Sequence, residues 1–307
     1  MREKLKEPLI LKPDSFVGLE QTPWAGTNIG NVFKSDVVSG ISGVPIGESW
    51  EFCISHKKLG SVEKCTNIAI KDYFSHPDLI YGRQLIERRN AIRDDSELLV
   101  KLIDTKEKLS FQVHPDDSFP SLTKDECGKA EAWLVVDKKP GAGVYLGFKE
   151  GVDEAELLEA IYNQTDLENY LQFVHLNKYD YVRVPVATPH AIGGGVTLIE
   201  PQIVRPGKNG KTLRISDWGR QYDHMGNQCF SGGSSRELHI NQAVQLINPK
   251  KQSGQGYLDS LIVKPERKVL DSLTELLIYE NTVAGLLNLI PLWYGQWVLF
   301  FCSYLEE

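Results

Sequence analysis

Two histidines, a glutamate and a glutamine in this chain have side chains that suit a divalent metal ion. Gln112 and His114 lie two positions apart in the alternating stretch L-S-F-Q-V-H, so both side chains point to one face of a strand. Glu131 begins the next strand-like run, and His190 lies in the stretch T-P-H-A-I-G. Imidazole nitrogens with carboxylate and amide oxygens suit Zn²⁺ best, with Fe²⁺, Mn²⁺ or Co²⁺ as alternatives. Spacing alone does not establish a metal site, because a lone histidine on a strand is more often a structural residue than a metal ligand.

The elements that would position these side chains are mostly β-strands. Apolar runs bounded by Gly- and Pro-rich turns predict short strands at 48–55, 98–103, 109–114, 132–136, 143–148, 181–185 and 196–199. Apolar residues at helical spacing predict two helical insertions, at about 69–93 and 153–174. Because strands and helices do not alternate along the chain, the pattern disfavours Rossmann and TIM architectures and favours a barrel or sandwich.

The composition is typical of a globular protein. The 307 residues include 34 Lys and Arg against 41 Asp and Glu, which gives a formal net charge of −7. This balance argues against nucleic-acid binding, since phosphate contacts need clustered cations. Five cysteines form no C-x-x-C pair and are expected to be reduced thiols, and the charged segment M-R-E-K-L-K-E-P does not resemble a signal peptide. We therefore expect a cytoplasmic protein.

Residues after about 250 differ in character from the rest. The polar, Gly-rich stretch at 250–256 predicts a linker. Residues 281–305 carry no charged side chain, which fits either a membrane span or buried strands, and polar residues and a proline within the run favour strands. We therefore predict a catalytic domain at 1–249 and a C-terminal segment at 250–307, with a truncated second β domain as one interpretation of that segment.

Six short sequence motifs occur in a fixed order along the chain. They are P-W-A-G at 23–26, I-G-E-S-W-E at 46–51, L-S-F-Q-V-H-P-D-D at 109–117, G-K-A-E-A-W at 128–133, V-P-V-A-T-P-H-A-I-G at 184–193 and R-I-S-D-W-G-R at 214–220. Together they resemble type I mannose-6-phosphate isomerases, which are zinc-dependent members of the cupin superfamily. The resemblance runs from about residue 10 to about residue 245. It implies a mainly β cupin, or jelly-roll, barrel with helical insertions and a shortened, atypical C-terminal segment.

The resemblance also implies a role for the residues at matching positions. One zinc ion per chain would be bound by Gln112, His114, Glu131 and His190. Ser110 and Lys129 match residues that contact the sugar phosphate and the reacting end of the substrate.

Three further residues match the region around the family's active site. Arg214 matches an arginine that the family keeps in its cleft, Glu200 matches a cleft carboxylate, and Asp217 lies nearby in the D-W-G-R motif. An arginine or lysine also suits the substrate phosphate. Arg214, with Lys129, is therefore both a substrate-binding and a catalytic candidate.

The implied reaction interconverts mannose 6-phosphate and fructose 6-phosphate through a cis-enediol. A base must move a proton between C2 and C1, while a Lewis-acid metal stabilises the negative charge that develops on oxygen. The catalytic candidates are Arg214, Lys129 and Glu200. The base itself stays open between Glu200, Lys129 and a zinc-bound water.

Two other classes of protein share the same barrel. The first is a sugar-phosphate sensor that keeps the metal and the cavity without turnover. The second is a cupin with oxygen chemistry, which usually has an H-x-H motif where this chain has Gln112-Val113-His114. The isomerase is favoured because Lys129, Arg214 and Glu200 are all present. The oligomeric state stays open.

The chain departs from the family pattern near several site residues. Ala187 stands where the family usually has a glycine, so a positive φ there would be strained. Ala130 replaces a threonine next to Glu131. The connection at 203–213 also differs from the family's and adds Arg205, Lys208 and Lys211, either for phosphate binding or as solvated charges.

Overall fold

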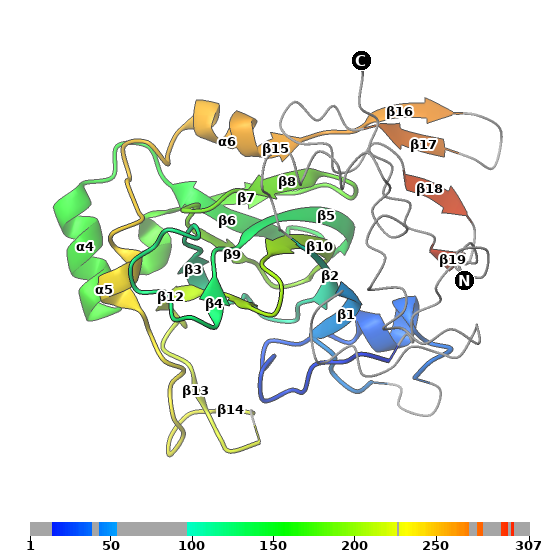
Figure 1. Ribbon diagram of the computed structural model, residues 1–307, viewed down its shortest axis with the longest axis horizontal. Coiled ribbons are helices and arrows are strands. Elements are labelled where there is room, and N and C mark those ends of the chain that lie inside the picture. Colours follow the sequence, from blue (N-terminus) through cyan, green and yellow to red (C-terminus); the bar gives the residue numbers. More distant parts are fainter. Residues whose placement is uncertain are drawn as a thin grey trace.

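The computed structural model describes residues 14–38, 43–53, 97–225, 227–269, 275–278, 290–293 and 296–297. Two antiparallel sheets form the centre of the molecule (Figure 1). The larger has six strands in the order β1 (Glu48–Cys53), β2 (Glu97–Asp104), β10 (Val196–Val204), β5 (Ala130–Lys138), β8 (Tyr181–Val184) and β15 (Ile262–Val263). The other has five, in the order β12 (Leu213–Ser216), β3 (Phe111–Val113), β9 (His190–Ile192), β6 (Gly143–Phe148) and β7 (Leu171–His175).

An apolar core joins the two sheets. Trp133 on β5 and Leu198 on β10 belong to the same buried cluster as Val144 and Leu146 on β6. Along β5 the intervening residues Leu134 and Val136 point to the other face, where they are buried in a separate cluster with Leu102 of β2. The predicted mainly β cupin barrel is confirmed.

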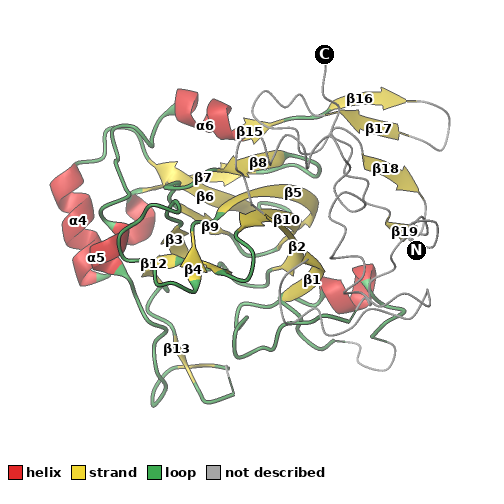
Figure 2. Ribbon diagram, viewed as in Figure 1, coloured by secondary structure: helices red, strands yellow, loops and turns green. Residues whose placement is uncertain are grey.

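Short helices cover the outer face of the five-stranded sheet. Leu157 and Ile161 of helix α4 (Glu154–Asn163) pack with Phe111 of β3 and Phe148 of β6 in a second buried cluster, to which α5 (Ile240–Ala243) adds Ala243. Figure 2 shows how few helices the fold contains among its described residues; the others are η2 (Ile29–Phe33), η3 (Leu167–Asn169) and α6 (Gln255–Leu261). Helices α4 and α5 therefore pack against the five-stranded sheet, whereas Leu258 and Leu261 of α6 belong to the core between the two sheets.

The described residues also form three smaller sheets. Strands β4 (Glu126–Cys127) and β11 (Asn209–Gly210) pair in parallel, and β13 (Gln221–Tyr222) and β14 (Gln228–Cys229) form a hairpin. Strands β16 (Glu266–Val269), β17 (Glu275–Ile278), β18 (Ile290–Trp293) and β19 (Gln296–Trp297) form a four-stranded sheet.

The predicted helical insertion at 153–174 is only partly helical. Asp153 caps α4 by accepting hydrogen bonds from the backbone N–H groups of Ala155 and Glu156, and the helix ends where Gln164 adopts φ +55°. After the turn η3, the last residues of the predicted helix form strand β7. The apolar spacing was therefore misread beyond Asn163. The other insertion, at 69–93, lies outside the described residues.

The predicted linker at 250–256 is wrong, because this segment is attached to the barrel. The carbonyl oxygen of Gln252 accepts a hydrogen bond from the N–H of Phe148 (2.9 Å), and its side-chain amide donates to the carbonyl oxygen of Ala187 (2.6 Å). The chain then continues through α6 into β15, which pairs with β8. The six-stranded sheet thus extends past residue 250.

The C-terminal segment contains strands, which the sequence favoured over a membrane span for its uncharged run. Strands β17, β18 and β19 form after residue 270. Strands β18 and β19 fall inside the uncharged run 281–305, and most of the rest of that run lies outside the described residues. Among the described residues, no helix is long and apolar enough to span a membrane.

Candidate metal centre

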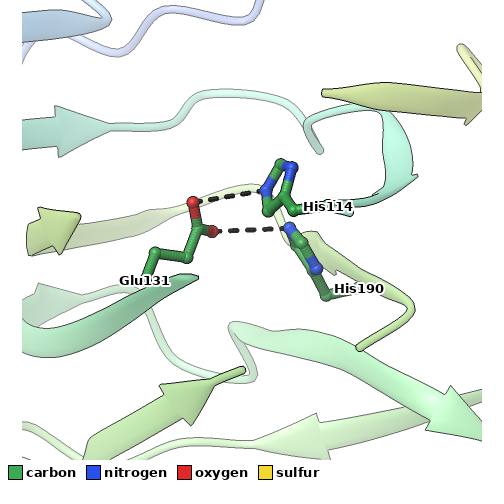
Figure 3. Close-up of side chains that lie close together, drawn as sticks. All are labelled: His114, Glu131 and His190. Carbon is green, nitrogen blue, oxygen red and sulfur yellow. Dashed lines mark ion pairs between the residues drawn. The ribbon is translucent and has the colours of Figure 1, made fainter. Parts of the chain in front are cut away.

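Three of the predicted ligands converge from both sheets. His114 directly follows β3 and His190 begins β9 in the five-stranded sheet, while Glu131 lies on β5 of the six-stranded sheet. Figure 3 shows the two imidazoles pointing at the two oxygens of the one carboxylate. Nε2 of His114 lies 3.3 Å from Oε2 of Glu131, and Nε2 of His190 lies 3.4 Å from Oε1. All three side chains are buried, and their nearest ligand atoms lie within 4.8 Å of one another.

Hydrogen bonds on the far side of each ring fix which nitrogen faces the carboxylate with its lone pair. Nδ1 of His114 lies 3.1 Å from the carbonyl oxygen of Lys211, and Nδ1 of His190 lies 2.8 Å from that of Thr188. A carbonyl only accepts, so each Nδ1 carries the proton and each Nε2 presents a lone pair. The buried Nε2 of His114 has no hydrogen-bond partner among the described atoms. Two lone pairs that face a carboxylate repel its negative charge, and a bound cation would offset this repulsion, so these residues fit a metal ion.

Burial favours neutral rings around a charged carboxylate. Burial and the nearby Lys129 ammonium lower the pKa of His114 to about 3, against the opposing charge of Glu131. Burial also lowers the pKa of His190. Burial alone would raise the pKa of Glu131, but the charge of the Lys129 ammonium, together with the interaction with the His114 ring, holds that pKa well below its usual value. Neutral imidazoles and an ionised carboxylate are the forms that bind a metal.

Gln112 lies beside the histidines in the position expected of a fourth ligand. It is directly opposite His190 in the β3–β9 pair, and its Nε2 is 3.2 Å from Nε2 of His190. Turning the amide about its last bond would place Oε1 there instead, because the two ends of an amide are interchangeable in shape. Oγ of Ser110 donates to Oε1 of Gln112 over 3.0 Å, so this predicted substrate residue also lies in the cluster.

A second carboxylate lies next to the centre. Glu200 on β10 shares two donors with Glu131: Nε1 of Trp133 is 3.2 Å from Glu131 and 3.3 Å from Glu200, and Nε2 of Gln202 is 3.0 and 2.6 Å from the same two carboxylates. Burial and the charge of Glu131 raise the pKa of Glu200 to about 8, although Lys101 opposes the shift. Two neighbouring carboxylates in different protonation states suit acid–base chemistry.

The predicted Lys129 and the unpredicted Lys101 supply positive charge here. Nζ of Lys129 lies 3.0 Å from Oε2 of Glu131. Nζ of Lys101 on β2 lies 3.2 Å from Glu48 and 3.6 Å from Glu200. Our sequence interpretation missed Lys101 and Gln202. Gln202 follows Glu200 by two positions on one strand, a signal that was available, whereas Lys101 lies in an apolar run whose inward face the spacing does not reveal.

The structure separates Arg214 from Asp217. Arg214 lies directly opposite Gln112 in the β12–β3 pair, so both side chains leave the same face of the sheet. Its Nη1 donates to the carbonyl oxygen of Glu237 over 2.7 Å, and its buried Nε has no hydrogen-bond partner among the described atoms. Asp217 instead binds the guanidinium groups of Arg220 and Arg236.

The chain is similar in sequence to known proteins. No family model matches the chain. A probable mannose-6-phosphate isomerase of Bacillus subtilis, GmuF, is 33% identical over 253 residues, which cover 79% of this chain and 69% of that protein. A mannose-6-phosphate isomerase of Streptococcus mutans is 27% identical over 246 residues, 79% of this chain and 68% of that one.

Solved structures share the fold. The crystal structure of a mannose 6-phosphate isomerase from Bacillus subtilis superposes with a TM-score of 0.59 at 24% identity, covering 90% of this chain and 77% of that one. A mannose 6-phosphate isomerase bound with zinc and yttrium superposes with a TM-score of 0.52 at 14% identity, covering 90% and 80%.

Fold and site together define a cupin with a buried His–Glu–His cluster that can bind a metal ion. The 33% sequence identity to GmuF shows to which family of cupins the chain belongs. The chain belongs to the type I mannose-6-phosphate isomerase family, as its sequence motifs indicated.

Proposed function

We propose that this protein is a zinc-dependent aldose–ketose isomerase that interconverts mannose 6-phosphate and fructose 6-phosphate. The observation that carries the proposal is the pair of Nε2 lone pairs, on His114 and His190, that face the ionised Glu131 inside the barrel. Family membership supplies the substrate class. Because sugar phosphates do not cross membranes unaided, we assign the reaction to the cytoplasm.

The metal would be held by the three clustered residues and by the amide oxygen of Gln112. Zinc fits this donor set, with two imidazoles and two oxygens, and the related isomerase structure bound with zinc supports the choice. When bound, zinc supplies a Lewis acid that polarises the substrate carbonyl and stabilises the enediolate. The remaining steps fall to side chains of the chain itself.

Glu200 is suited to carry the proton between C2 and C1. A group transfers protons most effectively when its pKa lies near the working pH, and burial with the charge of Glu131 raises the pKa of Glu200 to about 8. Trp133 and Gln202 each donate to one of its oxygens, so the carboxylate is held in one orientation. Lys129 remains the second candidate for this role, since its ammonium lies at the edge of the same cluster.

Substrate binding would use residues on the strands around Gln112. Ser110 and Arg214 both neighbour Gln112, one by a side-chain hydrogen bond and the other by strand pairing. An arginine with an unpartnered buried Nε suits a phosphate or a sugar hydroxyl. We assign Arg214 to substrate binding and to charge stabilisation during the reaction.

A coupled assay tests the proposal. Purified protein is given mannose 6-phosphate, and fructose 6-phosphate formation is followed before chelation, after chelation and after zinc is restored. Turnover that is lost with the chelator and regained with zinc is the expected result. In parallel, Arg214→Ala should abolish isomerisation while zinc content stays at the wild-type level.

Two other outcomes would overturn the isomerase assignment. Folded, zinc-loaded protein that binds mannose 6-phosphate without turnover would identify a sensor. Iron in the purified protein together with oxygen uptake would identify an oxygen-dependent cupin. Metal analysis and a binding isotherm separate these outcomes from a preparation that has lost its metal.

A further inference from the structure

The connection between β10 and β12 lies against the segment that carries Lys129. We call residues 205–212 the clamp loop. Its strand β11 pairs in parallel with β4, which ends two residues before Lys129. The N–H of Asn209 donates to the carbonyl oxygen of Asp125, and the N–H of Lys211 donates to that of Cys127, each over 2.9 Å. The backbone of the clamp loop is thus fixed to the approach to Lys129.

Side-chain ion pairs hold the same two segments together. Nε and Nη2 of Arg205 lie 2.7 and 2.6 Å from Oδ2 of Asp117, whose Oδ1 accepts from the N–H of Gly128 over 2.9 Å. Nζ of Lys211 lies 2.7 Å from Oε1 of Glu126. Two of the three cations that this connection adds are therefore engaged in ion pairs within the protein.

Gly210 makes room for the Lys129 side chain. A Cβ atom at position 210 would lie 2.8 Å from Cδ, 3.0 Å from Cγ and 3.1 Å from Cβ of Lys129. The aliphatic part of the Lys129 side chain therefore contacts Gly210 directly, and Nζ of Lys129 lies 3.0 Å from Oε2 of Glu131. Gly210 is not among the positive-φ glycines of the described chain, so it is the space for Lys129, and not a left-handed backbone, that requires a glycine here.

The clamp loop also orients a metal-site histidine. The carbonyl oxygen of Lys211 lies 3.1 Å from Nδ1 of His114, so it fixes the ring with Nε2 toward Glu131. One short connection thus contacts Lys129 through Gly210 and His114 through the adjacent carbonyl. Neither contact involves a charged group of the loop.

We propose that the clamp loop sets the position of the Lys129 ammonium relative to the metal centre, with Gly210 as the positioning residue. The proposal rests on the proposed function for the catalytic use of Lys129. It assigns Arg205 and Lys211 to holding the loop, and not to binding the substrate phosphate.

The substitution Gly210→Ala tests the contact directly. The added methyl group displaces a flexible lysine stem and leaves the backbone conformation permitted, so the fold is expected to survive. We expect kcat/KM to fall about 10²-fold, as for a displacement of about 1 Å at a reacting group, with zinc content unchanged. Lys129, buried in the wild type, should also be acetylated faster by acetic anhydride, as measured by peptide mass spectrometry.

A double-mutant cycle separates positioning of Lys129 from a general structural defect. In a Lys129→Ala background, Gly210→Ala should have no further effect on kcat/KM, because the side chain that it displaces is gone. Gly256→Ala is the matched control, since a Cβ there meets no atom of the described residues within 4 Å, and it should leave activity and acetylation of Lys129 unchanged. Lys208→Ala, which removes an exposed charge of the same loop, should also retain activity.

Several results would overturn the proposal. These are wild-type acetylation and activity in Gly210→Ala, a loss of activity that persists in the Lys129→Ala background, and a loss of zinc. If Gly210→Ala does not fold, Arg205→Ala loosens the loop without adding an atom and should give faster acetylation with about a tenfold loss of activity. If the wild type does not isomerise mannose 6-phosphate, the proposed function fails, but the acetylation rates still decide whether the loop holds Lys129.

Discussion

Gln112 and His190 lie directly opposite one another on neighbouring strands, with Nε2 of the amide 3.2 Å from Nε2 of the ring. Non-adjacent parts of the sequence thereby place an amide and an imidazole side by side against Glu131. A metal ion at this point would need the amide oxygen in place of the amide nitrogen. The arrangement of Gln112 and His190 therefore predicts which substitutions at position 112 preserve zinc binding.

We expect Gln112→Ala to weaken zinc binding by at least about 10- to 100-fold, because that is the usual cost of losing a residue that only supports a ligand. Gln112→Glu keeps an oxygen at the same place and should retain zinc. His190→Ala should lose more affinity than Gln112→Ala, because it removes a nitrogen ligand whose orientation Thr188 fixes. Competition with a colorimetric chelator measures all three. Wild-type affinity in Gln112→Ala would exclude the amide as a ligand.

A second prediction concerns the residue that links the two carboxylates. Gln202 is buried and donates to both Glu131 and Glu200. Gln202→Leu keeps a similar volume but removes these bonds, so Glu131 loses part of its orientation and zinc affinity should fall about 10- to 100-fold.

Gln172→Leu serves as the control for this substitution, since Gln172 bonds only a backbone carbonyl on β7 among the described contacts. It should leave zinc affinity unchanged. Equal zinc affinities for Gln202→Leu and the wild type would show that Glu131 is held without the amide.

Alternation along a strand predicted that the Gln112 and His114 side chains share one face, and both lie beside His190. Gln112 and His114 were placed on one face from their spacing, and the pairing of β3 with β9 brings His190 to Gln112. The spacing could not show that Glu131 lies on the opposite sheet, because that contact depends on how two sheets of distant segments pack. Motif resemblance supplied this long-range information.

The errors also have local physical causes. The stretch 153–174 carries helical apolar spacing, but the left-handed Gln164 ends the helix and long-range pairing with β6 makes Leu171–His175 a strand. The polar composition of 250–256 predicts a linker, although the side-chain amide of Gln252 donates a hydrogen bond to the carbonyl oxygen of Ala187 in the barrel. In both cases a tertiary contact outweighs the local pattern.

A third prediction follows from the buried ion pairs of Asp217. Burial raises the pKa of Asp217, but hydrogen bonds and charges from Arg236 and Arg220 outweigh it and keep that pKa below its usual value. Replacing the carboxylate leaves two partly buried guanidinium groups uncompensated, so Asp217→Asn should lower the free energy of unfolding by about 3 kcal/mol near neutral pH.

The pH dependence of this difference has a defined sign. A carboxyl with a lowered folded-state pKa stabilises the protein above its unfolded value, 3.8, and that stability is lost as the pH falls through the folded-state pKa. The difference between the wild type and Asp217→Asn should thus shrink as the pH falls below 3.8 and through the folded-state pKa. Urea unfolding at several pH values measures this, with the exposed Asp259→Asn as the control. A difference that stays constant with pH would contradict the charge-based explanation.

A fourth prediction concerns the turn before His190, where Ala187 adopts φ +62°. The sequence had indicated that a positive φ at this alanine would be strained, and two tertiary hydrogen bonds hold it there. Its N–H donates to the carbonyl oxygen of His114 over 2.7 Å, and its carbonyl oxygen accepts from Gln252 over 2.6 Å. Ala187→Gly relieves the left-handed strain but adds freedom to the unfolded chain. We expect a net gain of up to about 1 kcal/mol in the free energy of unfolding, with unchanged kcat and zinc content.

The control for Ala187→Gly is the same exchange where the backbone is helical. Ala155 is exposed in the first turn of α4, and Ala155→Gly should lower the free energy of unfolding by about 0.5–1 kcal/mol. Opposite signs for the two substitutions in urea unfolding would locate the effect in the backbone at position 187. If Ala187→Gly instead destabilises the protein as Ala155→Gly does, the turn is unstrained, and the two hydrogen bonds are then made without conformational cost.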